Sequence, residues 1–161
     1  MNCMNCGAFL ADKDLDYCPH CGCNVLIQKK VEYLSKLYYN QGLEKASIRD
    51  LSGAVNCLKQ SLTFNKRNIQ ARNLLGLVYF EMGEVVAALS EWVISKNLQS
   101  TRNIANEYIA QQTAMETAKT NMINAGMDKV AVNQIINSAT DDILLDTMLG
   151  AGKFALKAYS T

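Results

Sequence analysis

Residues 69–98 read IQARNLLGLVYFEMGEVVAALSEWVISKNL, and this stretch decides the fold of the chain. Apolar residues recur at helical spacing on both sides of Gly83 and Glu84, which interrupt the pattern. The stretch therefore predicts two helices joined by a tight turn. Gly76 and Ala88 stand where two antiparallel helices of this length would cross, and their small size permits close backbone approach. Because so short a pair buries little apolar surface alone, it is expected to stack on further copies.

A second copy of the pattern lies 34 residues upstream. The second helix of the pair is repeated there with its apolar face in register. A helix-turn-helix period of this length predicts an α-solenoid of antiparallel helical hairpins. Four aligned positions carry the register: Ala88 with Ala54, Leu89 with Val55, Trp92 with Leu58, and Ser95 with Ser61.

Period and pattern together resemble the tetratricopeptide repeat (TPR). The chain departs from the family at Arg72, where the family has Trp, and at Ser100, where it has Pro. In the earlier copy Gly42 is in place, but the Leu and Tyr positions hold other residues. The resemblance covers residues 35–100, and the alternative is a generic pair of helical hairpins with much the same fold. The family signature of Leu-Gly, Tyr, Gly, Ala, an aromatic and a small residue is matched by Leu75, Gly76, Tyr79, Gly83, Ala88, Trp92 and Ser95.

The resemblance also implies a binding surface. In TPR proteins the first helices of successive repeats line a concave groove that holds a partner peptide or helix. Members that grip a terminal carboxylate have a basic residue where this chain has Tyr39, which argues against that mode here. The chain's own C-terminal helices are the alternative occupant of the groove. The positions that would line it are Tyr39, Leu43, Asn73, Leu77, Phe80 and Glu81.

Two Cys-x-x-Cys pairs near the N-terminus predict a metal site. They read CMNCG at 3–7 and CPHCG at 18–22. The two-residue spacer lets both sulfurs of a pair reach one ion, and the Gly after each second Cys permits a left-handed turn. Four thiolates close a tetrahedral Zn²⁺ site with no open position, so one structural zinc ion is expected. The predicted ligands are Cys3, Cys6, Cys18 and Cys21.

This segment resembles the bacterial zinc ribbon, in which an aromatic residue precedes the third Cys, as Tyr17 does here. The resemblance implies a short β-hairpin over residues 8–16. So small a ribbon has almost no core, and metal coordination supplies most of its folding free energy. Cys23 is an alternative ligand, although the paired spacing favours Cys21. His20, the only histidine, is predicted to be exposed. A redox dithiol lacks its strand-helix context here, and a catalytic metal lacks a vacant position.

Composition favours a mostly helical protein. Of 161 residues 49% are hydrophobic, which is enough for a core, and the single proline, Pro19, leaves long helices possible downstream. The net charge of +1 gives no strong field. The basic cluster Lys66, Arg67 and Arg72 is expected to be a solvated turn, with a functional patch as the alternative. No apolar run reaches the about 20 residues of a membrane span and no secretory pattern begins the chain, so a cytoplasmic location is expected.

The expected domains are a small β zinc ribbon at 1–24, TPR-like helical repeats at 26–110, and C-terminal helices at 111–161. Composition shifts toward Ala, Thr, Asn and Met after Ser100. A long helix is predicted as far as Gly126, followed by shorter ones, including one that begins at Thr140 and Asp141. We expect this last third to cap the stack or to associate with a second copy of the chain.

No residue pattern predicts catalysis, because no Cys-His couple or Ser-His-Asp set stands in a suitable context. The expected function is a non-catalytic interaction module whose helical groove binds a partner protein or peptide. The alternative is a zinc-ribbon regulator that contacts nucleic acid. Between the two Cys pairs, however, Asp12, Asp14 and Asp16 outnumber Lys13, and phosphates would be repelled there.

Overall fold

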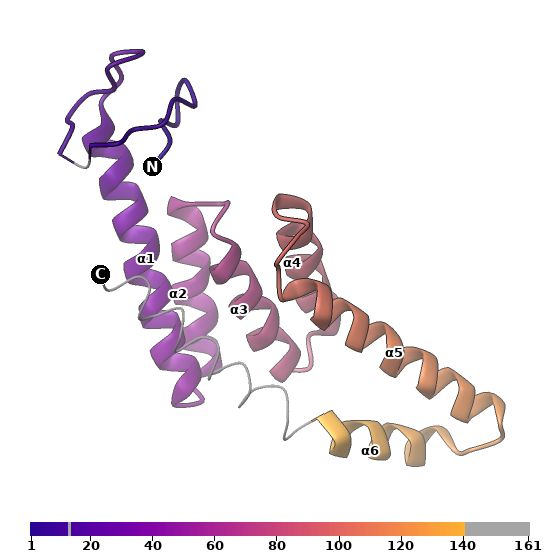
Figure 1. The fold of residues 1–161 in the computed structure, drawn as a ribbon. Coiled ribbons are helices and arrows are strands. Elements are labelled where there is room, and N and C mark those ends of the chain that lie inside the picture. The colour runs from indigo at the N-terminus through magenta and orange to yellow at the C-terminus, as the bar shows by residue number, and fades with distance from the viewer. Residues whose placement is uncertain (13, 141–161) are drawn as a thin grey trace.

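The computed structural model describes residues 1–12 and 14–140, which form a stack of antiparallel helices behind a small N-terminal module (Figure 1). Each helix packs on the next one along the chain. The prediction of a mostly helical chain built from antiparallel hairpins is confirmed. The predicted segment from Asp141 onward lies outside the described residues. The helices are α1 (Val25–Ser47), α2 (Leu51–Phe64), α3 (Ile69–Glu81), α4 (Val85–Leu98), α5 (Ala105–Asn124) and α6 (Lys129–Thr140).

Polar side chains and glycines set the limits of these helices. Asp50 Oδ1 accepts a hydrogen bond from the Gly53 N–H at 3.0 Å at the start of α2, and Asn68 caps α3 in the same way. Such caps satisfy amide groups that have no partner within the helix. Gly83, at a φ of 84°, makes the tight turn expected between α3 and α4. Gly126, at a φ of 92°, follows α5 in the same left-handed region, which favours glycine.

The hairpins are held close by glycines at their crossing points. A Cβ atom on Gly76 would collide with the indole of Trp92, and one on Gly42 would lie 2.8 Å from Leu58 Cγ. Trp92 is 1% exposed and its ring centroid lies 5.2 Å from that of Tyr108 on α5. The role expected for Gly76 is thus confirmed, and the same contact recurs one period upstream.

Helices α5 and α6 extend the chain away from the first two hairpins (Figure 1). Helix α5 crosses residue 110, where the sequence suggested a boundary. Val132 of α6 is fully buried, while Met127, Val130 and Ile135 nearby are exposed. None of the helices in the described part of the chain combines the length and apolarity needed to cross a membrane.

The glycine crossing yields a stability prediction. We expect Gly76→Ala to lower the free energy of unfolding by about 1–3 kcal/mol, because the new methyl group overpacks against Trp92. This outweighs the about 1 kcal/mol by which alanine favours a helix over glycine. Urea unfolding followed by circular dichroism measures the change.

The control is the same substitution in a Trp92→Phe background. The smaller ring removes the indole atoms that meet the methyl group, so the cost of Gly76→Ala should fall there. An equal cost in both backgrounds would contradict the overpacking explanation.

Candidate functional site

The N-terminal module consists of two matching turns, one around each Cys pair. The Gly7 N–H donates to the Cys3 carbonyl at 2.9 Å, and the Gly22 N–H donates to the Cys18 carbonyl at 2.8 Å. Both glycines have positive φ, 75° and 69°, as the sequence pattern requires. The turns therefore present the two Cys pairs in equivalent ways. Each turn is flanked by an isolated antiparallel bridge, Asn2 with Phe9 and Tyr17 with Asn24.

No β-strand forms in the described residues of this module, and the β-hairpin implied over residues 8–16 is not seen. Backbone carbonyl groups in the segment between the two Cys pairs accept hydrogen bonds from α1 instead. The Lys29 ammonium group donates to the Leu15 carbonyl at 2.8 Å, and the Val25 N–H donates to the Asp16 carbonyl at 2.8 Å. Contacts with α1, rather than a strand ladder, satisfy these carbonyl groups.

The two turns bring four cysteine sulfurs into one cluster. The Sγ atoms of Cys3, Cys6, Cys18 and Cys21 all lie within 4.8 Å of one another. The Cys3 and Cys21 sulfurs are 3.6 Å apart, and those of Cys6 and Cys18 are 3.7 Å apart. A tetrahedral site with metal–sulfur bonds of about 2.3 Å has sulfurs about 3.8 Å apart. The spacing fits a single tetrahedral metal ion held by these four side chains.

Cys23 adds a fifth sulfur beside the cluster. Its Sγ lies 3.2 Å from that of Cys3, closer than the edge of a tetrahedral site allows. The thiols of Cys3 and Cys21 raise the pKa of Cys23 to about 12. Because Cys6 has an equally raised pKa, the pKa values do not separate Cys23 from the other cysteines. The geometry favours Cys21 as the fourth ligand.

Hydrogen bonds and neighbouring thiols shift the pKa values of the clustered cysteines in opposite directions. The Asn5 side chain and the Cys23 backbone N–H lower the pKa of Cys21 to about 5. At Cys6 the Ala8 N–H lowers the pKa, but desolvation and three neighbouring thiols outweigh it and raise the pKa to about 12. Because thiolates this close repel one another, they ionise together only around a bound cation.

The module is fixed to α1 without a linker. Gln28, which is 6% exposed, accepts from the Met4 N–H at 3.0 Å and donates to the Asn2 carbonyl at 2.7 Å. Val25, the first residue of α1, is fully buried against Leu10 of the module. The cysteine cluster is therefore held on the end of a long helix.

Within the stack, a buried polar junction joins the first two hairpins. The hydroxyl groups of Ser35 on α1 and Ser61 on α2 lie 3.1 Å apart, and the Asn68 Nδ2 donates to the Ser35 Oγ at 3.1 Å. The Asn68 Oδ1 accepts from the Ala71 N–H at the start of α3. One amide thus ties the first hairpin to the beginning of the second.

The same junction recurs one period later. The Asn103 Nδ2 donates to the Ser95 Oγ at 2.9 Å, and its Oδ1 accepts from both the Asn73 Nδ2 and the Ala105 N–H. These bonds fix the orientation of both amides. The Asn73 Oδ1 is consequently left without a hydrogen-bond partner in the described part of the chain. The 34-residue repeat in the sequence reveals the serine of each junction, since Ser61 and Ser95 align, but not the asparagine.

An open recess of about 470 Å³ lies over the two junctions. We call it the junction recess. Its wall comes from the middle of α1, the beginning of α3 and the turns that lead into α3 and α5. The residues that line it are Glu32, Ser35, Lys36, Asn65, Arg67, Asn68, Ile69, Gln70, Asn73, Gln99, Arg102, Asn103 and Ile104.

Of the six residues expected to line a groove, Asn73 alone lines the junction recess. Glu81 is half-buried and forms an ion pair with Arg49 at 3.4 Å. The Phe80 ring centroid lies 6.0 Å from that of Trp92. The other three belong to the hydrophobic core and are at most 5% exposed: Tyr39, Leu43 and Leu77.

The basic residues expected to form a solvated turn have separate roles. Arg72 forms an ion pair with Glu91 at 2.7 Å, and its guanidinium group also donates to the Lys66 carbonyl. Arg67 instead lines the junction recess, whereas Lys66 does not.

Comparison with known protein families, with curated proteins and with solved structures found no match to this chain.

The cluster geometry predicts which cysteines bind metal. We expect Cys21→Ser to weaken Zn²⁺ binding about 100-fold, because one of four ligands is lost. Cys23→Ser should leave the affinity unchanged, and Cys57→Ser on α2 is the control for loss of a thiol outside the module. A competition titration against a chromophoric chelator measures all three. Equal weakening by Cys21→Ser and Cys23→Ser would show that the ligand set is wrong.

Proposed function

We propose that the protein is a non-catalytic docking module, in which a TPR-like stack of helical hairpins binds a partner protein or peptide. The junction recess is the observation that supports this most directly. Residues from α1, from α3 and from the turn before α5 contribute to its wall. A volume of about 470 Å³ falls within the range of ligand-binding pockets. A surface shared by successive hairpins is the kind that helical-repeat proteins use for binding.

The N-terminal module is proposed to be a zinc ribbon-like cap with a structural role. Four thiolates at tetrahedral spacing suit Zn²⁺ and leave no position for a substrate or an activated water. The hydrogen bonds of Gln28 and the burial of Val25 hold the module on α1. Metal binding would therefore stabilise the module together with the first turns of α1.

Catalysis has little support among the described side chains. His20 is exposed within a Cys turn, and the four clustered cysteines lie close enough together to serve as metal ligands. A general acid-base site needs titratable groups with matched roles in a cleft. In the described part of the chain, the junction recess holds arginines, amides, Lys36 and a single carboxylate, that of Glu32, and neither histidine nor cysteine lines it, which suits binding better.

The test blocks the recess with a large side chain. Peptides would first be selected from a phage-displayed library on the zinc-loaded protein. We expect Gln70→Trp, at the rim of α3, to weaken binding of a selected peptide by at least about tenfold, measured by fluorescence anisotropy. Gln60→Trp on the exposed face of α2 is the matched control and should bind as the wild type does. Equal binding by both folded variants would contradict docking at this surface.

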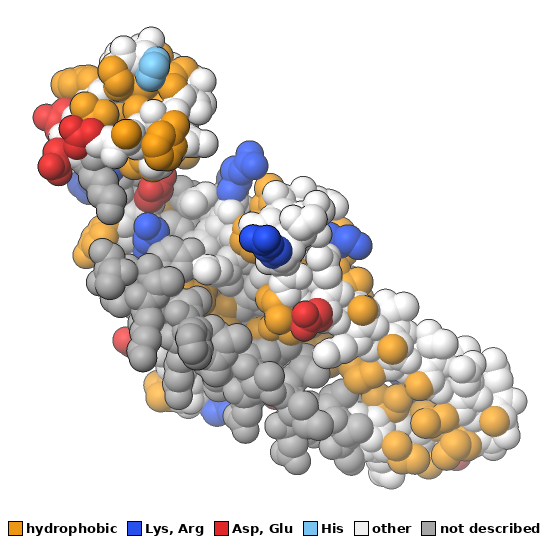
Figure 2. Space-filling model, in the orientation of Figure 1, with side chains coloured by type: hydrophobic (Ala, Val, Ile, Leu, Met, Phe, Trp, Pro, Cys, Tyr) orange, Lys and Arg blue, Asp and Glu red, His pale blue; other side chains and the backbone are white. Residues whose placement is uncertain are grey.

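A second experiment addresses the nucleic-acid alternative. Acidic side chains gather on one side of the N-terminal module (Figure 2), where Asp12, Asp14 and Asp16 are exposed. We therefore expect no binding to a single-stranded RNA or a DNA duplex at about 50 mM salt. Binding that falls steeply between about 50 and 200 mM salt would favour the nucleic-acid regulator. Electrophoretic mobility shift with the zinc-loaded protein measures this.

A further inference from the structure

The tripeptide Arg-Asn-Ile occurs twice in the chain, at 67–69 and at 102–104. The two copies are 35 residues apart, and each forms the turn into the first helix of a hairpin. All six residues line the junction recess. The asparagine of each copy is buried in a polar junction, whereas the arginine of each copy is exposed. The repeated tripeptide thus places an exposed arginine and a buried asparagine at two positions around the junction recess.

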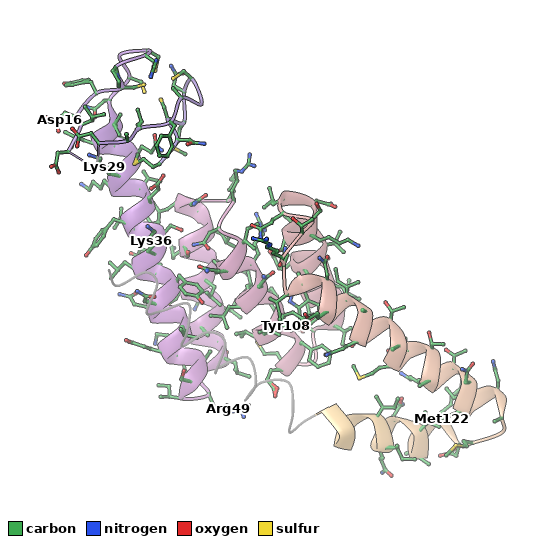
Figure 3. The ribbon with its side chains drawn as sticks, viewed as in Figure 1. Asp16, Lys29, Lys36, Arg49, Tyr108 and Met122 are labelled. Carbon is green, nitrogen blue, oxygen red and sulfur yellow. The ribbon has the colours of Figure 1, made fainter. Side chains whose placement is uncertain are left out.

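The two arginines are available to a ligand. Neither Arg67 nor Arg102 takes part in an ion pair with the described residues, unlike Arg49 and Arg72. Lys36 on α1 also lines the recess (Figure 3), and Glu32 is the one carboxylate among the lining residues. Three basic groups against one acidic group favour an anion.

The backbone at Arg102 is held in an uncommon conformation. Its φ is 53°, in the left-handed region that few non-glycine residues adopt. The Gln99 Nε2 donates to the Arg102 carbonyl at 3.2 Å, and the Asn103 Nδ2 donates to the Gln99 carbonyl at 3.0 Å. The turn that carries this arginine is therefore fixed by side-chain hydrogen bonds to its backbone.

The buried amide oxygens of the recess require a hydrogen-bond donor, in addition to the anion that the basic groups favour. Asn73 is 8% exposed, and the bond from its Nδ2 to Asn103 leaves its Oδ1 without a partner. The Gln70 Oε1 is also buried without a partner among the described residues. An isolated carboxylate ion supplies only acceptors at neutral pH. A peptide carries backbone N–H groups beside its acidic side chain, and so can supply both kinds of group.

We propose that the junction recess binds an acidic side chain of a peptide, with the carboxylate against Arg67 and Arg102 and a neighbouring peptide N–H toward the Asn73 acceptor. This inference rests on the proposed docking function and adds the chemistry of the partner. Arginine suits the task because its planar guanidinium group donates to carboxylates in fixed directions. The isoleucines that follow, Ile69 and Ile104, supply apolar contacts for the remainder of the peptide.

The test compares matched short peptides on the zinc-loaded full chain. The probes are acetyl-Gly-Asp-Gly-amide and acetyl-Gly-Asn-Gly-amide, which differ only in the charge of one side chain. The side-chain amide signals of Asn73 and Asn103 in nitrogen-15 NMR spectra report binding. We expect saturable shifts with the Asp peptide and at least about tenfold weaker binding of the Asn peptide.

Variants then assign the charge contacts. Arg67→Ala and Arg102→Ala should each weaken binding of the Asp peptide about tenfold. Lys66→Ala is the matched control, because it removes the same charge from the same turn outside the recess. Thermal unfolding checks that each variant folds. Equal binding by all three variants, or equal shifts with the Asp and Asn peptides, would overturn the proposal.

Two further ligands test whether the recess prefers another kind of anion. Gly-Gly-Gly with a free C-terminus tests a terminal carboxylate, and inorganic phosphate tests a free oxyanion. If either binds as tightly as the Asp peptide, recognition of an acidic side chain is wrong. The proposed docking function is tested separately by the library peptides. Selected peptides that lose affinity for the Gln70→Trp variant but carry no acidic residue would support docking and would refute this inference.

Discussion

A buried side-chain amide at each boundary between hairpins sets the geometry of the stack. Asn68 and Asn103 each bond to a serine of the preceding hairpin and to an amide at the start of the following helix. Because buried amides are costly unless paired, these bonds allow few arrangements of one hairpin relative to the next. The apolar contacts around Trp92 and Leu58 belong to the hydrophobic core, but they are less directional. The polar junctions fix the register in which those contacts form.

The same junctions line the recess, because Asn68 and Asn103 stand in the turns that lead into α3 and α5. The turns that supply the asparagines also supply the arginines, so structure and binding chemistry come from one repeated tripeptide. A substitution at Arg67 or Arg102 removes an exposed group, whereas one at Asn68 or Asn103 disturbs the packing of two hairpins. Adjacent residues in the turn therefore have distinct tasks.

Much of this arrangement could be predicted from the sequence. The apolar period, the break at Gly83 and the small residue at Gly76 are local or periodic signals, and they indicated helical hairpins with a tight crossing. The cysteine spacing indicated four sulfurs around one ion, and the structure brings those sulfurs together. The sequence did not predict that the described residues of 8–16 would lack the expected β-hairpin. Hydrogen bonds from Lys29 and Val25 of α1 to backbone carbonyl groups of this segment depend on the tertiary structure. The two Arg-Asn-Ile copies were visible in the sequence, but their shared opening depends on how the hairpins stack.

The continuity of α1 has a mechanical consequence. One uninterrupted helix holds the N-terminal module through Val25 and Gln28 in its first turn. It carries the Ser35 and Lys36 side of the recess about ten residues after Val25, roughly 15 Å along its axis. No break in α1 separates the two, so the helix connects the module with the cysteine cluster directly to the wall of the recess. A displacement of the N-terminal module relative to the stack would therefore act on the recess through α1.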